Sequence, residues 1–179
     1  MAEPVAATVS AWAEEQADPQ ECALLYVAHS LPEKFIDRGD PYLDQVTATV
    51  AAAHRITATC LAGGEEQQFL AALASGPDAR LVFQSKVGPV KWLGPEITAE
   101  VERLAAGGCR RLFVQPISFT CEHVETLHEL DIELKADAVK LGIDDFARGP
   151  ALNLHPDWLE SLATELAAAV FEPEVGAHV

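Results

Sequence analysis

The feature that most constrains the fold is a short apolar run, Ala23-Leu-Leu-Tyr-Val-Ala28, which ends abruptly at His29-Ser-Leu-Pro32. An apolar run of this length, closed by a turn signal, is typical of a strand buried in a parallel sheet. In open α/β sheets, ligands bind at the carboxyl ends of the strands. His29 stands at that end, and an imidazole can accept a proton or bind a metal near neutral pH. We therefore expect a site to form beside His29.

The rest of the chain alternates between helix-forming and strand-forming segments. Strands are expected at residues 23–28, 81–83, 112–114 and 145–148, and helices at 3–17, 42–62, 65–74, 96–106, 120–141 and 156–170. This alternation predicts parallel strands joined by right-handed helical crossovers. The expected fold class is α/β, a three-layer sandwich around a four-stranded, mainly parallel sheet. One domain should span residues 1–179, with residues 172–179 as a flexible tail.

The charge balance excludes several classes of partner. The chain carries 28 acidic and 12 basic residues, for a net charge of −16. Such an excess of negative charge argues against binding to nucleic acid or to anionic lipid. No apolar run approaches the roughly 20 residues that a transmembrane helix needs. The first residues, Met-Ala-Glu-Pro, lack the basic segment of a secretory signal, so a cytoplasmic protein is expected.

The four cysteines do not form a recognisable metal-binding framework. They are Cys22, Cys60, Cys109 and Cys121, and no two of them make a C-x-x-C pair. A zinc or iron–sulfur site is therefore not indicated. Reduced, partly buried thiols are the expected state, with Cys121 set apart because it lies in an acidic stretch.

Three clusters of chemically capable residues follow the first three expected strands, so they should meet at one edge of the sheet. They are His29 with Ser30, Lys91 with Trp92, and the stretch 119–129. Within that stretch, Glu122, Glu125 and Glu129 fall at i, i+3 and i+7, which predicts one helix face. Carboxylates that repel one another near a histidine attract cations.

Each cluster also has a purely structural interpretation. His29 could be a hydrogen-bonded structural residue, Trp92 a packing anchor, Glu122 a helix cap, and the glutamate face simply solvated. The common phosphate loops, G-x-G-x-x-G and G-x-x-x-x-G-K, do not occur in the sequence, which removes the usual nucleotide sites. Taken alone, the residues predict an α/β protein with a His/Glu metal site or acid–base site.

A set of motifs, in chain order, resembles the C-terminal, catalytic half of ferrochelatases. They are Ala28-His-Ser-Leu-Pro32, Arg38-Gly-Asp-Pro-Tyr42, Gln84-Ser-Lys-Val-Gly-Pro-Val-Lys-Trp-Leu-Gly-Pro95, Pro116-Ile-Ser-Phe-Thr-Cys-Glu-His-Val-Glu-Thr-Leu-His-Glu-Leu-Asp131 and Ala151-Leu-Asn153. Together they cover nearly the whole chain, and the combination is highly specific. The usual chain of that family has two similar α/β domains, and this one resembles only the second. The resemblance therefore implies a chelatase-like, Rossmann-like half.

The resemblance also implies an activity and a set of site residues. The activity is that of a metal-chelatase lyase, which inserts Fe²⁺ into protoporphyrin IX or coproporphyrin in haem biosynthesis. The implied residues are His29 and Glu125 as catalytic and metal-binding groups, Ser30, Trp92 and Phe119 as porphyrin contacts, and His123 and Glu129 as a proton or metal path. Fe²⁺ would enter as a substrate, with no other cofactor. Some members of the family bind an iron–sulfur cluster through C-terminal cysteines. No such cluster is expected here, because no cysteine follows Cys121.

Half of a porphyrin cleft would leave apolar loop surface facing water, including Trp92 and Phe35, and such patches mark interfaces. We therefore expect a homodimer or a missing N-terminal domain, besides porphyrin and Fe²⁺. Three alternatives stay open at this point. They are a non-catalytic tetrapyrrole- or metal-binding half-domain, a short homodimeric chelatase acting on another tetrapyrrole, and a truncated reading frame without an independent role.

Overall fold

The apolar run forms the centre of strand β1, Cys22–His29, in which every residue except His29 is buried. In the computed structural model, which describes residues 2–13, 21–60 and 79–171, β1 lies between β2 (Ala79–Gln84) and β3 (Arg111–Pro116). Strand β4 (Asp145–Arg148) pairs with β3, giving the order β2-β1-β3-β4. All three pairings are parallel. The four-stranded α/β sheet expected from the sequence is therefore confirmed.

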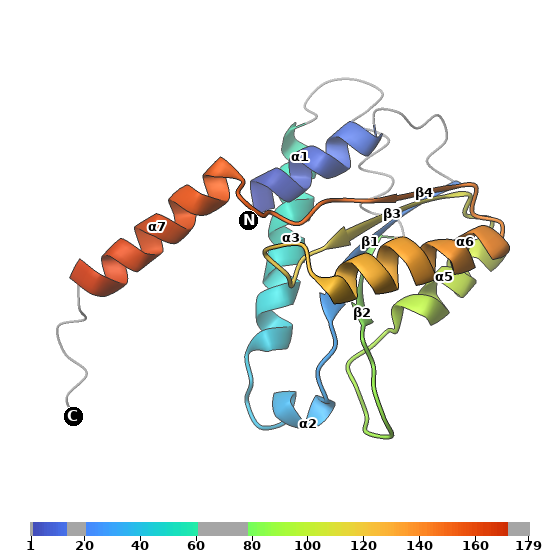
Figure 1. The fold of residues 1–179 in the computed structure, drawn as a ribbon, viewed down its shortest axis with the longest axis horizontal. Helices are drawn as coiled ribbons and strands as arrows, with labels where there is room; N and C mark the ends of the chain where they lie inside the picture. Colours follow the sequence, from blue (N-terminus) through green and yellow to red (C-terminus); the bar gives the residue numbers. More distant parts are fainter. Residues whose placement is uncertain (1, 14–20, 61–78, 172–179) are drawn as a thin grey trace.

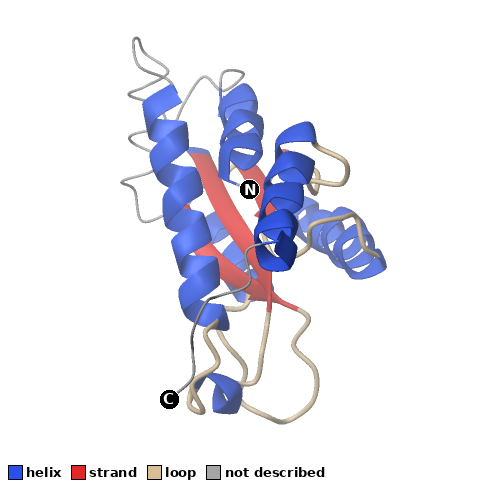
Figure 2. Ribbon diagram, turned by 90° about the vertical axis from the view of Figure 1, so that its left-hand side faces the viewer, coloured by secondary structure: helices blue, strands red, loops and turns tan. Residues whose placement is uncertain are grey.

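Helices cover both faces of this sheet (Figures 1 and 2). Helices α1 (Ala2–Ala13) and α3 (Tyr42–Cys60) lie on one face. The other face is covered by α5 (Ile97–Ala106), the π-helix η2 (Thr126–Leu134) and α6 (Lys135–Lys140). Two further helices are α2 (Glu33–Ile36) and α7 (Pro156–Phe171). The helix expected at 65–74 and the tail at 172–179 lie outside the described residues.

The alternation of side chains along β1 builds a separate core on each face. Leu24, Tyr26 and Ala28 pack in the cluster with α1 and α3. Ala23, Leu25 and Val27 pack in the cluster with α5, η2 and α6. Successive side chains of a strand point to opposite faces, so an unbroken apolar run is what a strand covered on both faces requires.

The third helix-forming region differs from the prediction. The sequence pattern predicts one helix over 120–141, but residues 120–123 are irregular and the helical backbone begins at residue 124. Residues 126–134 then form a π-helix rather than an α-helix. The early part stays out of the helix because its backbone is bonded elsewhere: the Glu122 N–H donates to Asn153 Oδ1 at 2.9 Å. π-Helical turns are rare and frequently occur at functional sites.

Long loops follow β1 and β2 beyond the carboxyl edge of the sheet (Figure 2). The expected loop at 29–42 contains the short helix α2, and the loop at 85–95 pairs with it through a bridge between Pro32 and Trp92. Two backbone bonds join the same loops, from Leu93 N–H to the Leu31 carbonyl and from Glu33 N–H to the Lys91 carbonyl. The carboxyl edge of β1 is thus enclosed by ordered loops.

Candidate functional site

The candidate site lies where the direction of chain progression changes in the sheet. From β1 the chain goes to β2 on one side, and then crosses to β3 on the other side of β1. Crevices at such switch points, outside the carboxyl ends of parallel strands, are where open α/β folds bind ligands. His29 is the last residue of β1 and therefore stands at this crevice.

Hydrogen bonds fix the His29 backbone and ring. Its N–H donates to Ser118 Oγ at 2.8 Å, and its carbonyl accepts from the Tyr42 hydroxyl at 2.7 Å. Nδ1 lies 2.8 Å from the Ser30 carbonyl, which can only accept, so Nδ1 carries a proton. In a neutral imidazole the lone pair is then on Nε2.

Tyr42 reaches His29 because of the loop before α3. Gly39 has φ +94°, a left-handed conformation that glycine adopts at little cost. Asp40 Oδ1 accepts the Tyr42 N–H at 2.9 Å, which caps the start of α3. Burial raises the pKa of Tyr42, and this outweighs the lowering effect of a hydrogen bond with Ser118. Tyr42 is therefore a neutral donor at physiological pH.

The Nε2 atom of His29 faces Glu125, the residue that the resemblance names with His29 as a catalytic and metal-binding group. His29 Nε2 and Glu125 Oε2 are 3.1 Å apart. Among the described residues, Glu125 Oε2 is buried from solvent and receives no hydrogen bond. Two lone-pair donors that face each other repel unless a proton or a metal cation lies between them. The pair can therefore take up either.

The spacing of this pair also suits a small divalent cation. With metal–ligand distances of about 2.1 Å, two ligand atoms at right angles lie about 3 Å apart. Imidazole nitrogen and carboxylate oxygen are both acceptable ligands for Fe²⁺. Within the described ranges, no group of three His, Cys, Asp or Glu side chains is placed to hold a metal.

Two aromatic rings continue the site from His29. The Phe119 ring meets the His29 ring edge to face, with centroids 5.9 Å apart. The His123 ring stacks on Phe119 at 5.0 Å with an angle of 2°. His123 Nδ1 also accepts the Glu125 N–H at 3.4 Å, at the start of the helix. The sequence-predicted residues His29, Phe119, His123 and Glu125 are therefore brought together in one row.

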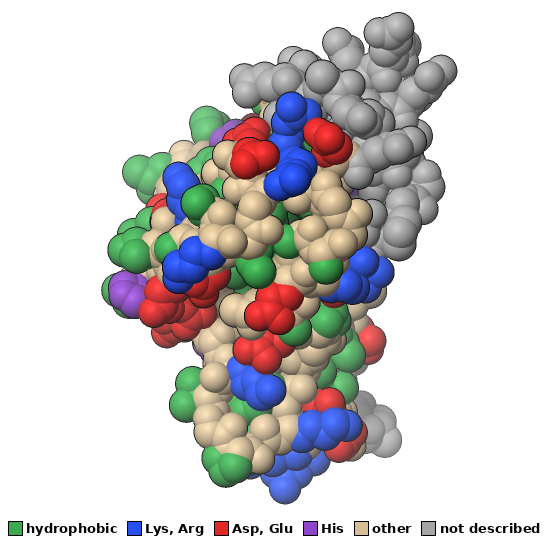
Figure 3. Space-filling model, turned by 90° about the vertical axis from the view of Figure 1, so that its right-hand side faces the viewer, with side chains coloured by type: hydrophobic (Ala, Val, Ile, Leu, Met, Phe, Trp, Pro, Cys, Tyr) green, Lys and Arg blue, Asp and Glu red, His purple; other side chains and the backbone are tan. Residues whose placement is uncertain are grey.

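Glu129 lies on the same helix but is bonded toward a different strand. Its Oε2 accepts the Ser85 hydroxyl at 2.7 Å and Gln84 Nε2 at 3.0 Å, at the carboxyl end of β2. Ser85 has φ +65°, a conformation that is uncommon for residues other than glycine. Glu129 also borders a groove of about 640 Å³, which is lined by Lys86, Glu133 and residues of α5 and α6. Figure 3 shows that acidic and basic side chains are interspersed on the face over these helices.

Ser30 and Trp92, the other two predicted porphyrin contacts, lie in the loops. Ser30 is buried, and its hydroxyl donates to the Leu93 carbonyl at 3.1 Å. Trp92 is half-buried and donates its indole N–H to the Val87 carbonyl at 2.9 Å. Phe35 is 41% exposed, in agreement with its expected position on an open surface. Cys22 and Cys109 are buried, and Cys121 is exposed.

The expectation that Glu122, Glu125 and Glu129 share one helix face is wrong for Glu122. Glu122 precedes the helix and is not a helix cap. Its Oε1 accepts from Arg148 Nη1 at 3.2 Å and from the Ala151 N–H at 2.9 Å, so the side chain is held against the 148–151 segment. The 3.6-residue spacing predicted a shared face only if the helix included residue 122, and the helix begins after that residue.

Sequence reasoning missed three residues that build the site: Tyr42, Ser118 and Arg148. Tyr42 and Ser118 lie within motifs quoted above, and each bonds the backbone of His29. Arg148 ends the short strand β4 and pairs with Glu122 and Asp131. Arg148 lies in none of the quoted motifs, and the sequence pattern does not identify its partners.

The chain is similar in sequence to known proteins of one family. The sequence model of the family described as Ferrochelatase matches residues 1–169. Curated ferrochelatases from Geotalea daltonii and Geotalea uraniireducens are 40% and 39% identical over 156 and 143 residues, which are 87% and 80% of this chain. A ferrochelatase from Trichodesmium erythraeum is 37% identical over 161 residues, or 89% of this chain. The matched regions cover 43%, 40% and 38% of those relatives, so the chain spans about two-fifths of their length. Among the helices described, none is long and apolar enough to cross a membrane.

Proposed function

The chain belongs to the ferrochelatase family, and from this premise we propose that it forms the metal-inserting half of a ferrochelatase-type lyase. Its substrates are Fe²⁺ and a porphyrin, protoporphyrin IX or coproporphyrin, in haem biosynthesis. The observation that carries the proposal is the His29–Glu125 pair, with Nε2 and Oε2 3.1 Å apart at the carboxyl edge of the sheet. We propose that no cofactor is needed besides the iron substrate, and that the enzyme acts in the cytoplasm.

Metal insertion requires two pyrrole protons to leave the porphyrin while Fe²⁺ exchanges its water ligands for four nitrogens. His29 can accept a proton at Nε2, because Nδ1 is already committed to the Ser30 carbonyl. Glu125 supplies a carboxylate oxygen without a hydrogen-bond donor among the described residues, which favours a cation beside it. Each insertion forms four Fe–N bonds and releases two protons to solvent.

The surrounding residues fit supporting roles. Phe119 offers a rigid aromatic wall next to His29, and Trp92 lies in the loop that encloses the same edge. Ser30 acts through the backbone of that loop, since its hydroxyl is bonded to the Leu93 carbonyl. Glu129 borders the groove beside η2, whereas His123 stacks on Phe119 on the other side of Glu125 in the sequence. Both can serve in a route by which protons or metal exchange with solvent.

We further propose that this half works against a second half. Helix α7 extends away from the sheet (Figure 1) and exposes a stripe of apolar side chains, Leu159, Leu162, Leu166 and Val170. These positions fall at i, i+3, i+7 and i+11, so they lie on one helix face. The curated relatives are more than twice as long as the matched region. The occupant we propose for the stripe is an N-terminal half of the kind the family has, and a second copy of this chain is the outcome to be tested against it.

Two other functions keep specific support. A non-catalytic tetrapyrrole- or metal-binding half-domain is favoured by the lack of a third metal donor among the described residues. A short homodimeric chelatase for another tetrapyrrole is favoured by the apolar stripe on α7.

The test is metalloporphyrin formation by the purified chain, followed by absorbance with Fe²⁺ under anaerobic conditions or with Zn²⁺. The proposal predicts a rate above the uncatalysed reaction, and a higher rate when a second half is present. Porphyrin binding without metal insertion under either condition would favour the non-catalytic module. If the chain neither binds porphyrin nor inserts metal under either condition, the proposal is overturned.

A further inference from the structure

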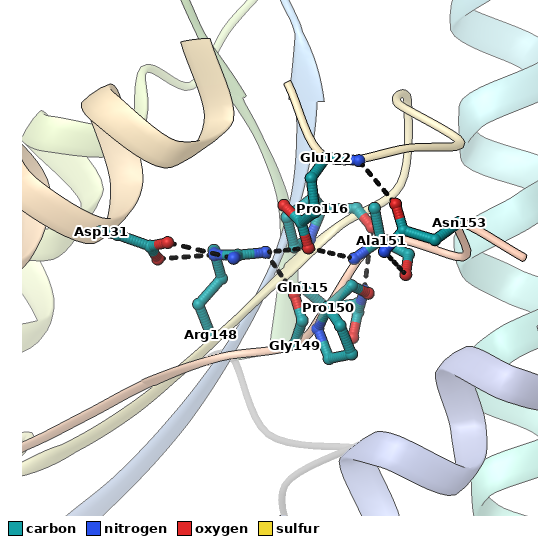
Figure 4. A network of polar contacts seen from close by, with 9 residues as sticks. All are labelled: Gln115, Pro116, Glu122, Asp131, Arg148, Gly149, Pro150, Ala151 and Asn153. Atoms are coloured by element: carbon teal, nitrogen blue, oxygen red, sulfur yellow. Dashed lines mark hydrogen bonds and ion pairs between the residues drawn. The ribbon is translucent and has the colours of Figure 1, made fainter. Parts of the chain in front are cut away.

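Arg148, the last residue of β4, joins two segments that carry site residues (Figure 4). Its side chain is 12% exposed. The guanidinium group donates to both carboxylate oxygens of Asp131, with Nη2 3.0 Å from Oδ2. Nη1 donates to Glu122 Oε1 at 3.2 Å and to the Gly149 carbonyl at 2.9 Å. Such a planar fork fixes the direction as well as the distance of its partners.

The bonds of Glu122 extend this network to the chain after β4. Glu122 Oε1 accepts the Ala151 N–H, and the Glu122 N–H donates to Asn153 Oδ1, each at 2.9 Å. The Asn153 N–H donates to the Thr120 carbonyl at 2.8 Å. Asn153 has φ +49°, a left-handed conformation that asparagine tolerates better than most residues. The 119–123 loop is therefore held along its length by residues 148–153.

The two carboxylates bound by Arg148 flank the residues that face His29. Glu122 directly precedes His123, whose ring stacks on Phe119. Asp131 lies in η2, six residues after Glu125 in the sequence. Arg148 thus holds the loop with the aromatic pair and the helix that follows Glu125 at the same time.

The network also distributes charge along an acidic segment. Residues 122–133 contain five carboxylates and neither Lys nor Arg. Arg148 pairs with two of these carboxylates, Glu122 and Asp131. Glu129 receives neutral donors, Ser85 and Gln84. Without Arg148, Glu122 would be a carboxylate with a buried Oε2 and no cation, a costly arrangement that moving the loop would relieve.

We propose that Arg148 is a positioning residue of the site, which sets the Phe119–His123 pair and Glu125 against His29 by holding Glu122 and Asp131 together. Its two carboxylate partners lie 17 and 26 residues away in the sequence, so Arg148 joins segments that are distant along the chain. That these residues then act on iron and porphyrin rests on the proposed function, whereas the positioning itself does not.

The test compares Arg148→Met with the unaltered chain by NMR. The stacked geometry shifts the imidazole protons of His123 through the Phe119 ring current and gives a nuclear Overhauser effect between the two rings. Arg148→Met should lose both signals while circular dichroism shows a folded sheet. Arg110→Met is the matched control, because the Arg110 side chain donates to the Gly142 carbonyl at 2.7 Å in an exposed contact outside this network. It should leave both signals unchanged.

Two further variants keep the test decisive. If Arg148→Met does not fold, Asn153→Gly removes the side-chain bonds to Glu122 and Ala151 but allows the same positive φ, and it should weaken the ring-current shift. Arg148→Lys keeps the charge without the fork and should resemble Arg148→Met. Unchanged signals in folded Arg148→Met or in Asn153→Gly, or full rescue by lysine, would overturn the positioning role.

A metal titration separates this inference from the proposed function. If His29 and Glu125 bind Zn²⁺, Arg148→Met should weaken that binding by about 10-fold to 100-fold, as loss of supporting residues does at other metal sites. If the unaltered chain binds no Zn²⁺ but Arg148→Met still loses the ring signals, the proposed function fails and the positioning role stands. If Zn²⁺ binds and neither signal nor affinity changes in folded Arg148→Met, the positioning role fails alone.

Discussion

His29 Nε2 and Glu125 Oε2 lie 3.1 Å apart, and Nδ1 of the same imidazole is held by the Ser30 carbonyl at 2.8 Å. The contact at Nδ1 determines what Nε2 presents to Glu125, because a proton fixed on Nδ1 leaves the Nε2 lone pair of the neutral ring directed at a carboxylate. The pair is therefore incomplete without a proton or a cation.

Replacing His29 with alanine should abolish metal insertion without unfolding the domain. His29 ends β1 and is one-third exposed, with 33% of its side chain accessible, so its loss leaves the two cores intact. Circular dichroism should stay unchanged while metalloporphyrin formation falls to the uncatalysed rate. The matched control is His155→Ala, an exposed histidine beside Asp157, which should keep full activity. A His29→Ala chain that melts or aggregates would mean that His29 is a structural residue.

Glu125 and Glu129 should respond differently to substitution by glutamine. Glu125→Gln removes the charge next to His29, so both the metal affinity and the insertion rate should collapse. Glu129→Gln keeps an oxygen that can accept from Ser85 and Gln84, so turnover should slow more mildly and its pH dependence should shift. Rates measured against pH and against Fe²⁺ or Zn²⁺ concentration check both expectations. A greater loss of metal affinity in Glu129→Gln would mean that the metal lies farther along the helix.

The apolar stripe on α7 should make the purified chain associate. Sedimentation at micromolar concentration should detect self-association of the isolated chain or a complex with an added second half. Leu162→Glu with Leu166→Glu should abolish that association, because both side chains lie on the stripe. Ser161→Glu adds charge on the opposite side of the helix and should have no effect. A clean monomer that inserts metal at an enzyme-like rate would contradict this prediction.

Tyr42 should link stability to alkaline pH. Burial raises its pKa, so between the unfolded and folded pKa values the folded chain holds a proton that the unfolded chain has released. The free energy of unfolding therefore falls as pH rises through this window, above about pH 10. Tyr42→Phe should lose about 1 kcal/mol at pH 7 with the bond to the His29 carbonyl, and should then decline less steeply above pH 10. Denaturant unfolding at several pH values measures both slopes, and equal slopes would refute the link.

The parts of the fold that depend on local pattern could be predicted from the sequence. The run 23–28 gave the central strand because a strand covered on both faces must be apolar at every position. His29 followed as the residue at the ligand-binding edge, and the motif around Glu125 gave its partner. The roles assigned to Ser30, Trp92 and Phe119 stay predictions, and the single domain over 1–179 does too.

The parts that depend on distant contacts could not be predicted in this way. Glu122 left the expected helix face because its backbone and side chain bond to residues 151 and 153, about thirty positions later. Arg148 has partners 17 and 26 positions away that follow no helix or strand period. The π-helix at 126–134 has the same residue types as an α-helix, so its period was not visible in the pattern.

The central claim, that His29 and Glu125 together hold the metal, is tested most directly by a Zn²⁺ titration of the chain labelled with ¹⁵N at its histidine side chains. Zn²⁺ should shift the His29 Nε2 resonance and leave the hydrogen-bonded Nδ1 as the protonated nitrogen, and Glu125→Gln should abolish the shift. If His29 Nε2 does not move while Zn²⁺ binds elsewhere, or if it moves equally in Glu125→Gln, the two residues do not form the metal site.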